Sequence, residues 1–177
     1  MRVRLKDKDF ELYIPRTRID QEVSRLAAEM KEAGIGDRTV FVGVLKGAFM
    51  FFSDLMKHMP AGSRQEFVFA RSYAGTQSTG RVEMQGLNTL ALEGCDVILV
   101  EDIVDSGLTA NYLAGQFQET GALRVRICAF LFKSEVYRGL REIDFVGIHI
   151  PNYFVVGYGL DYEEEGRCLP DIYRLLS

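Results

Sequence analysis

Residue types that often build metal or redox sites are scarce in this chain of 177 residues. Its three cysteines, Cys95, Cys128 and Cys168, form no CxxC pair, and its two histidines, His58 and His149, lie far apart in the sequence. We therefore expect no metal cluster built from cysteine and histidine. Widely spaced cysteines of odd number also fit a reducing compartment, and we expect a cytoplasmic protein.

The chain also lacks the features of nucleic-acid-binding, membrane and disordered proteins. The net charge of −4 supplies no basic surface for nucleic acid. No apolar stretch is long enough to span a bilayer, because Lys46 interrupts the longest candidate. The charged N-terminal sequence leads into no apolar stretch, so we expect no signal peptide. Without linker, repeat or low-complexity run, residues 1–177 are expected to form one domain that binds small molecules.

Several apolar runs are typical of strands that are buried on both faces of a sheet. The predicted strands are residues 39–45, 66–73, 96–100, 125–132, 145–150 and 154–158. Between them, apolar residues recur at helical spacing. The predicted helices are residues 19–33, 47–58 and 109–120. Strands that alternate with helices predict an α/β fold, with a mainly parallel sheet and helices on both faces.

Local signals define the ends of two of these helices. Asp20 is expected to cap the first helix, and Gly34 and Gly121 stand where the first and third helices would end. The second helix is apolar nearly all round, as expected in a core or at a subunit interface. A mainly parallel sheet binds its ligands at the carboxyl ends of its strands, where we expect the site.

Residues 74–90 depart from this alternation of strands and helices. They are polar, small and glycine-containing at the start, and long irregular connections in compact domains are usually mobile functional loops. The alternative is a hairpin with a polar tip, because residues 81–84 (RVEM) have the pattern of a short strand. A mobile, hairpin-like lid combines both interpretations.

The most informative segment is VILVEDIVDSGLT, residues 97–109. Glu101 and Asp102 follow a wholly apolar strand, and a Ser-Gly turn then leads into a helix. Such a turn presents several backbone N–H groups to one point. With the helix dipole and the Ser106 and Thr109 hydroxyls, these groups form an anion cradle. Carboxylates beside it would repel a phosphate unless they face ribose hydroxyls or hydrated magnesium.

Simpler interpretations of this segment compete with a binding site. An acidic residue before a helix is often only a solvated N-cap, and for Asp105 alone that interpretation is preferred. Three acids at the end of one apolar strand, followed by Ser-Gly-Leu-Thr, favour the binding site. A hydride-transfer enzyme and a Walker-type nucleotide hydrolase are both disfavoured, because the chain has neither a GxGxxG turn after its first strand nor a GxxxxGK[ST] loop.

Four segments resemble a known family. VEDIVDSGLT (100–109) resembles the phosphoribosyl diphosphate signature of the type I phosphoribosyltransferases. Residues 42–51, 71–80 and 154–172 narrow the resemblance to hypoxanthine-guanine phosphoribosyltransferases, because they are similar to the LKG loop, the mobile Ser-Tyr loop and the base-binding segment. The segments occur in the family's order. The resemblance implies the type I phosphoribosyltransferase fold, with a small hood built from the terminal segments and a mobile loop at about 71–86.

The resemblance assigns most site residues to phosphoribosyl diphosphate. Glu101 and Asp102 would bind the ribose hydroxyls and water on magnesium, and Asp105 would be the general base that accepts the proton of purine N7. The residues that would hold the 5-phosphate are Asp105, Ser106, Gly107, Leu108 and Thr109. Those that would contact the diphosphate are Lys46, Gly47 and Arg167, with Ser72 and Tyr73 closing over it.

A second group of residues would bind the purine. Lys133 would donate to the 6-oxo group, which favours 6-oxopurines over adenine. Phe154 would stack on the ring, the Val155 backbone would bond its edge, and Asp161 would lie at the base and coordinate Mg²⁺ with the two strand-end acids. Without the resemblance, Lys133 would be an exposed strand-end lysine, Phe154 a core residue and Arg167 a surface arginine beside a solvated turn of glutamates.

The implied reaction is magnesium-dependent purine salvage. A 5-phosphoribosyl group would pass from 5-phosphoribosyl 1-diphosphate to N9 of hypoxanthine or guanine, giving IMP or GMP and diphosphate. The chain departs from many members of the family at Ser106, where they have threonine, at Leu108, where others have lysine, and at Ser134 after the lysine. Members are homodimers or homotetramers, and the resemblance implies one of these states.

Two other functions remain open from the sequence. One is a regulatory module that keeps the fold and binds RNA, which would need a basic face. The other is an enzyme of the same fold that acts on xanthine, adenine or a pyrimidine. The sequence does not rank hypoxanthine, guanine and xanthine, does not separate dimer from tetramer, and leaves the isomer of the Leu45–Lys46 peptide and the metal stoichiometry open.

Overall fold

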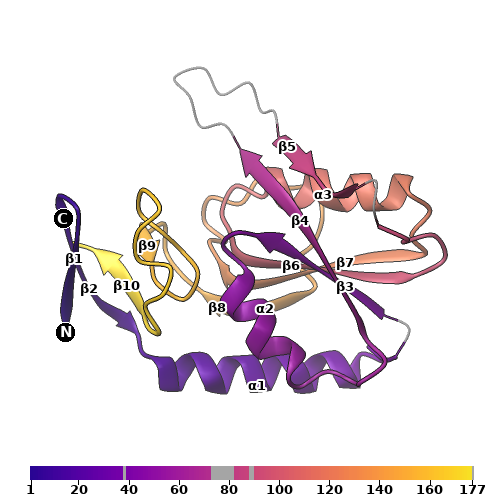
Figure 1. Cartoon of the computed structure of the whole chain (residues 1–177), viewed down its shortest axis with the longest axis horizontal. Coiled ribbons are helices and arrows are strands. Elements are labelled where there is room, and N and C mark those ends of the chain that lie inside the picture. The colour runs from indigo at the N-terminus through magenta and orange to yellow at the C-terminus, as the bar shows by residue number, and fades with distance from the viewer. Residues whose placement is uncertain (38, 73–81, 88–89, 177) are drawn as a thin grey trace.

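The computed structural model describes residues 1–37, 39–72, 82–87 and 90–176, which form two sheets and three helices (Figure 1). The larger sheet has the strand order β5-β4-β3-β6-β7-β8, and all its neighbours pair in parallel except β4 and β5. Its strands are β3 (Thr39–Leu45), β4 (Arg64–Ser72), β5 (Val82–Gln85), β6 (Asp96–Val104), β7 (Arg124–Phe132) and β8 (Phe145–His149).

Helices cover both faces of this sheet, and each face has its own core. The helices are α1 (Arg16–Glu32), α2 (Phe49–Met56) and α3 (Leu108–Glu119). Along β6, Ile98 packs with α1 and α2, whereas Leu99 packs with α3, because successive side chains of a strand point to opposite faces. The predicted α/β class is confirmed. None of the described helices is long and apolar enough to cross a membrane.

The helix ends confirm two predictions and correct one. Gly34 and Gly121 follow α1 and α3 with φ of 77° and 87°, a conformation that glycine adopts without steric cost. The prediction that Asp20 caps the first helix is wrong, because α1 already begins at Arg16, after Pro15. Instead, an Asp20 carboxylate oxygen forms an ion pair with a terminal nitrogen of Arg16 at 2.7 Å, and Arg16 lies one helical turn earlier.

The second sheet is small and antiparallel, with the order β1-β2-β10-β9. Its strands are β1 (Arg2–Leu5), β2 (Lys8–Ile14), β9 (Val155–Val156) and β10 (Ile172–Leu175). Both chain termini lie in it, at one end of α1 (Figure 1), which confirms the hood of terminal segments. The predicted strand 154–158 shrinks to two residues and joins this sheet rather than the larger one.

Two local predictions changed around the expected site. The strand predicted at 96–100 continues to Val104, so Glu101 and Asp102 lie within β6 instead of after it. At the base of the predicted lid, Phe69 pairs with Gln85 in an antiparallel ladder, which supports the hairpin interpretation. Residues 73–81, which include Tyr73, lie outside the described residues, as does the side chain of Ser72.

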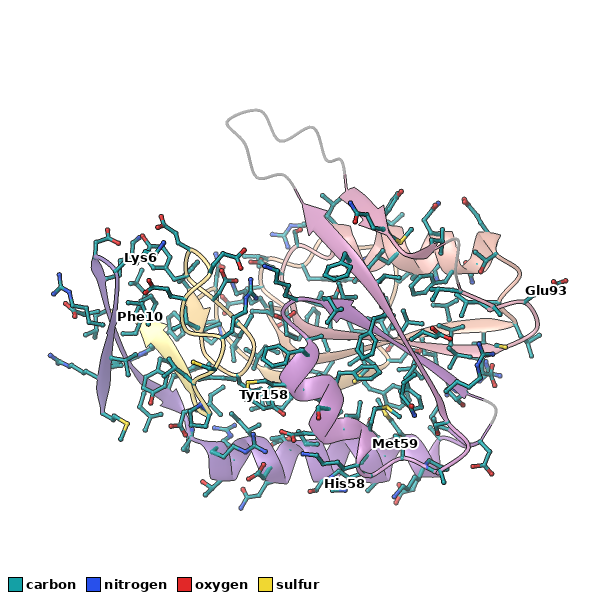
Figure 2. All side chains as sticks on the ribbon, in the orientation of Figure 1. Lys6, Phe10, His58, Met59, Glu93 and Tyr158 are labelled. Atoms are coloured by element: carbon teal, nitrogen blue, oxygen red, sulfur yellow. The ribbon has the colours of Figure 1, made fainter. Side chains whose placement is uncertain are left out.

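Tyr158 connects the small sheet to the body of the protein, and it lies between the loops of the small sheet and α2 (Figure 2). The side chain is 1% exposed, and its ring centroid is 5.2 Å from that of Phe130 in β7. Its hydroxyl donates to Asp54 of α2 at 2.9 Å, and Arg16 also pairs with Asp54, at 2.7 Å. These contacts hold the C-terminal loops beside the carboxyl ends of the parallel strands.

Candidate active site

A cavity of about 420 Å³ opens at the carboxyl ends of β3, β4 and β6. Its lining includes most of the residues assigned to ribose, diphosphate and magnesium, together with Thr109 from the predicted 5-phosphate loop: Lys46, Gly47, Glu101, Asp102, Thr109, Asp161 and Arg167. The Leu45–Lys46 peptide at its wall is cis. The larger sheet supplies the acids Glu101 and Asp102, and the loops on either side supply two further acids and the cations Lys46 and Arg167.

Glu101 and Asp102 form a buried acid pair. Glu101 is only 6% exposed, and burial raises its pKa well above the ordinary range, with a further contribution from the charge of Asp102. Burial also raises the pKa of Asp102, to about 6, although the backbone N–H of Ile103 donates to Oδ1 at 2.9 Å and opposes the shift. Two adjacent carboxylates in the wall of the cavity, one buried and one partly exposed to it, are suited to a cationic ligand.

Gly47 packs directly against this acid pair. A Cβ at Gly47 would overlap the Asp102 carboxylate, and a Cβ at Gly159 would overlap the carbonyl oxygen of Gly47. Three segments that are distant in sequence therefore meet with no room for side chains. The loop after β3, the middle of β6 and the loop after β9 are held in one arrangement.

The predicted anion cradle lies at the start of α3. Gly107 is the N-cap, with φ of 84°, and no side chain caps the helix, so the interpretation of Asp105 as its N-cap is wrong. Asn111 secures the loop: its Nδ2 donates to the Gly107 carbonyl at 2.8 Å, while its Oδ1 accepts from the N–H groups of Leu140 and Arg141. Sequence reasoning missed Asn111, because its partners are far along the chain.

Asp105 is instead paired with Lys133. The Lys133 ammonium donates to Asp105 Oδ2 at 2.9 Å and to Asn152 Oδ1 at 3.1 Å. Lys133 is 7% exposed, so the interpretation as an exposed strand-end lysine is wrong. The proposed base and the proposed 6-oxo donor are thus brought together from the ends of β6 and β7. Asn152 was not predicted, and no local signal distinguishes it from a loop asparagine.

At the opposite side of the cavity, Arg167 joins an ion-pair network. It lies 2.8 Å from Asp161 and 3.6 Å from Glu164, and it donates to the Gly159 carbonyl at 2.9 Å. Its side chain is 21% exposed, which does not fit a simple surface arginine. Its buried Nε has no hydrogen-bond partner in the described part of the chain. Glu164 also pairs with Lys46 at 2.9 Å.

Two of the purine-binding candidates, Phe154 and Val155, are not among the residues that line this cavity. Phe154 is 47% exposed, so the core-packing interpretation of its ring is wrong. The ring lies 6.3 Å from Phe10 and 5.9 Å from Tyr162, which leaves part of it open. Val155 is buried in β9. Phe154 follows Asn152 by two positions in the sequence, and Asn152 accepts a hydrogen bond from Lys133 of the Asp105–Lys133 pair.

Comparison with known proteins agrees with these features. Residues 15–163 match the model of the phosphoribosyl transferase domain. A hypoxanthine-guanine phosphoribosyltransferase from Bacillus subtilis is 38% identical over 164 residues, which cover 92% of this chain and 91% of the relative.

Solved structures are similar over almost the whole fold. A hypoxanthine-guanine phosphoribosyltransferase from Bacillus anthracis, with a HEPES molecule in its active site, has a TM-score of 0.87 at 34% identity and covers 94% of this chain and 98% of its own. A hypoxanthine phosphoribosyltransferase from Staphylococcus aureus has the same TM-score at 35% identity, covering 94% and 91%. With the family model, the sequence identity and the fold in agreement, this chain belongs to the phosphoribosyltransferase family.

Proposed function

We propose that this chain salvages purines by transferring a 5-phosphoribosyl group from 5-phosphoribosyl 1-diphosphate to N9 of hypoxanthine or guanine. The products are IMP or GMP and diphosphate. The observation that carries the proposal is the Asp105–Lys133 pair, 2.9 Å apart, beside a cavity with two buried acids and two loop cations. An acid and an ammonium at this spacing match N7–H and the 6-oxo group on one edge of a 6-oxopurine.

At the base, Lys133 donates to the 6-oxo oxygen and Asp105 accepts the proton of N7. Loss of this proton makes N9 more nucleophilic; N9 forms a bond to C1 of the ribose while the bond from C1 to the diphosphate oxygen breaks. Phe154 stacks on the ring, and the Val155 backbone bonds its edge. Adenine presents an amine in place of the oxo group, and the Lys133 ammonium has no lone pair with which to accept a hydrogen bond from that amine.

At the phosphoribosyl end, the carboxylates of Glu101 and Asp102 accept hydrogen bonds from the ribose hydroxyls. The 5-phosphate binds the N–H groups and hydroxyls of Ser106, Gly107, Leu108 and Thr109 at the start of α3. Lys46, Gly47 and Arg167 hold the diphosphate, a role for which the planar guanidinium of Arg167 is well suited. Ser72 and Tyr73 close over it and exclude water from the sugar.

Magnesium fits this donor set as a ligand shared with the substrate. Within the described residues, no group of three or more His, Cys, Asp or Glu side chains could hold a metal ion. Mg²⁺ commonly uses one or two carboxylates together with substrate phosphates and waters. Asp102 and Asp161, with Glu101 through water, would supply the protein's share. When bound, the ion neutralises charge on the leaving diphosphate.

The test is a nucleotide-forming assay with phosphoribosyl diphosphate and each of hypoxanthine, guanine, xanthine and adenine, with and without Mg²⁺. We expect IMP or GMP with magnesium, little product with adenine, and little product after chelation. The matched control is a reaction without phosphoribosyl diphosphate. Absence of product from every 6-oxopurine would refute the proposed function.

We further propose that residues 1–177 act as one cytoplasmic catalytic unit that assembles into a homodimer or homotetramer. The three cysteines are free, as expected in a reducing compartment. Phe49 and Phe67 are 43% and 44% exposed on α2 and β4, and such aromatic surface is typical of subunit interfaces. Analytical ultracentrifugation should show two or four chains, and Phe67→Ser should shift the mass toward one chain; a monomeric wild type would overturn this.

A further inference from the structure

Glu164 contacts both cations that are assigned to the diphosphate. Its Oε2 accepts a hydrogen bond from Lys46 Nζ at 2.9 Å and lies 3.6 Å from a terminal nitrogen of Arg167. Lys46 belongs to the loop after β3, whereas Glu164 and Arg167 belong to the loop after β9. All three side chains line the same cavity of about 420 Å³. One carboxylate therefore stands where an anionic ligand would meet both cations.

The backbone holds Glu164 in this place independently of Lys46. The Glu164 N–H donates to Asp161 Oδ2 at 2.8 Å, and the other oxygen of Asp161 pairs with Arg167 at 2.8 Å. Glu163 and Glu164 have φ of 49° and 69°, as in a tight turn whose ends are bonded. The loop therefore presents the Glu164 carboxylate to the cations as a consequence of its own fold.

The contact with Lys46 is nevertheless easy to exchange. The side chains of Lys46 and Glu164 are 48% and 61% exposed, and ion pairs of this exposure contribute little because water solvates both partners. A diphosphate carries several negative charges and more acceptor oxygens than one carboxylate. An exposed ion pair of this kind is therefore a weak barrier to an anion that needs both Lys46 and Arg167.

From this geometry we propose that Glu164 is a built-in competitor of the diphosphate group. In the ligand-free protein it pairs with the two cations and holds them facing the cavity, and after reaction it promotes release of the product diphosphate. The proposal rests on the proposed function, because it assumes that Lys46 and Arg167 bind the diphosphate. It assigns to Glu164 the tuning of affinity and of product release, with no part in the transfer step.

The neighbouring Glu163 provides a matched control. It pairs with Lys6 at 2.9 Å, on the β1–β2 hairpin of the small sheet, and Figure 2 shows Lys6 at the outer end of this hairpin. Glu163 carries the same charge one residue away, but it is not among the residues that line the cavity. Glu163→Gln therefore changes the net charge of the turn without releasing Lys46 or Arg167.

The primary experiment is calorimetric titration of inorganic diphosphate at a fixed MgCl₂ concentration into wild type, Glu164→Gln and Glu163→Gln. We expect Glu164→Gln to bind diphosphate about three- to fivefold more tightly, the size of competition from one exposed ion pair. Glu163→Gln should stay close to wild type. Weaker binding by Glu164→Gln, or an equal change in both variants, would overturn the proposal.

Two further variants separate contact from net charge. Glu164→Asp keeps the charge and shortens the reach, so it should also tighten diphosphate binding; wild-type affinity would mean that only charge matters and would overturn the competitor role. In a Lys46→Met background, Glu164→Gln should increase the affinity for diphosphate much less, because the Lys46–Glu164 ion pair no longer exists in either protein. An undiminished gain would exclude competition for Lys46.

Steady-state kinetics provide an independent result. In Glu164→Gln we expect a lower KM for phosphoribosyl diphosphate and a lower kcat, because slower diphosphate release limits turnover. If the wild type is active and Glu164→Gln has the same KM and kcat, this inference is overturned but the proposed function is not. A wild type that neither forms nucleotide nor binds diphosphate would overturn the proposed function as well, so the two failures are distinguishable.

Discussion

The two ends of the candidate active site are built differently. At the base end, Asp105 and Lys133 directly follow adjacent parallel strands; the Asp105 carboxylate is 53% exposed, but its partner Lys133 is 7% exposed and is also held by Asn152. At the diphosphate end, Lys46 and Glu164 come from two loops and are about half exposed. Proton transfer needs donor and acceptor held within a fraction of an ångström, whereas a product that must leave needs contacts that exchange readily. Rigid strand ends and exchangeable loop pairs satisfy these two needs.

Asp105→Asn is the most direct way to break the base end. We expect kcat to fall by about 10²- to 10⁴-fold, the usual contribution of a general base. Phosphoribosyl diphosphate affinity should change little, because the carboxylate acts on the purine. Single-turnover rates and direct binding measurements would separate the two quantities. Equal losses in rate and in affinity would show that Asp105 has a structural role instead.

Gly47→Ala tests whether the diphosphate end also depends on exact packing, at the contact between the loop after β3 and Asp102. A Cβ at this position would overlap the Asp102 carboxylate, so the loop or the acid must shift. Displacement of about 1 Å costs about 100-fold in kcat/KM. Gly115→Ala is the matched control, because no atom lies near its Cβ and alanine suits a helix. Wild-type kinetics in Gly47→Ala would show that the contact is unimportant.

Lys133→Met sharpens the comparison by removing the 6-oxo donor while keeping the length of the side chain. We expect kcat/KM for hypoxanthine to fall by about 10- to 100-fold, as for loss of one hydrogen bond from a charged donor. Discrimination against adenine should weaken in parallel, and competition assays would measure it. Unaltered discrimination would mean that another group recognises the 6-oxo oxygen.

Asn152→Ala probes the second partner of Lys133. The ammonium keeps its pair with Asp105 but loses the acceptor at 3.1 Å, so its position should become less defined. We expect KM for the purine to rise by about three- to tenfold, the size of one modest hydrogen bond. KM for phosphoribosyl diphosphate should not move. A rise in both would indicate a wider change of the loop.

The smallest expected effect concerns the connection between the two regions. Burial raises the pKa of Asp54, but hydrogen bonds from Lys57 and Tyr158 and the charge of Arg16 outweigh it and leave that pKa below its ordinary value. A lowered acid pKa stabilises the fold above the unfolded-state pKa, and this contribution disappears as the pH falls through the folded-state value.

Asp54→Asn should therefore lower the free energy of unfolding by about 1 kcal/mol at neutral pH. The difference from wild type should shrink at acidic pH, where the wild-type carboxyl becomes protonated. Urea unfolding at pH 7 and at about pH 3, below the ordinary pKa of an aspartate, would measure both differences. A difference that grows on acidification would contradict the assigned sign.

Much of the fold was determined by local pattern in the sequence. The strands predicted at 39–45, 96–100 and 125–132 are continuous apolar runs, and burial on both faces leaves them few alternatives. The strands β1, β2 and β10 were not predicted, although charged and apolar residues alternate in β1 and in most of β2; β1 and β10 have only four residues each. Their position depends on pairing between the two ends of the chain.

For the site, the sequence by itself determined which residue types follow which strands: the acid pair, the Ser-Gly turn and Lys133. Only the tertiary structure decided their partners. Asn152 meets Lys133 across 19 positions and Glu164 meets Lys46 across 118. Periodicity reports which face of its own element a residue occupies, whereas these contacts depend on the order of strands in the sheet and on how the loops fold over its edge.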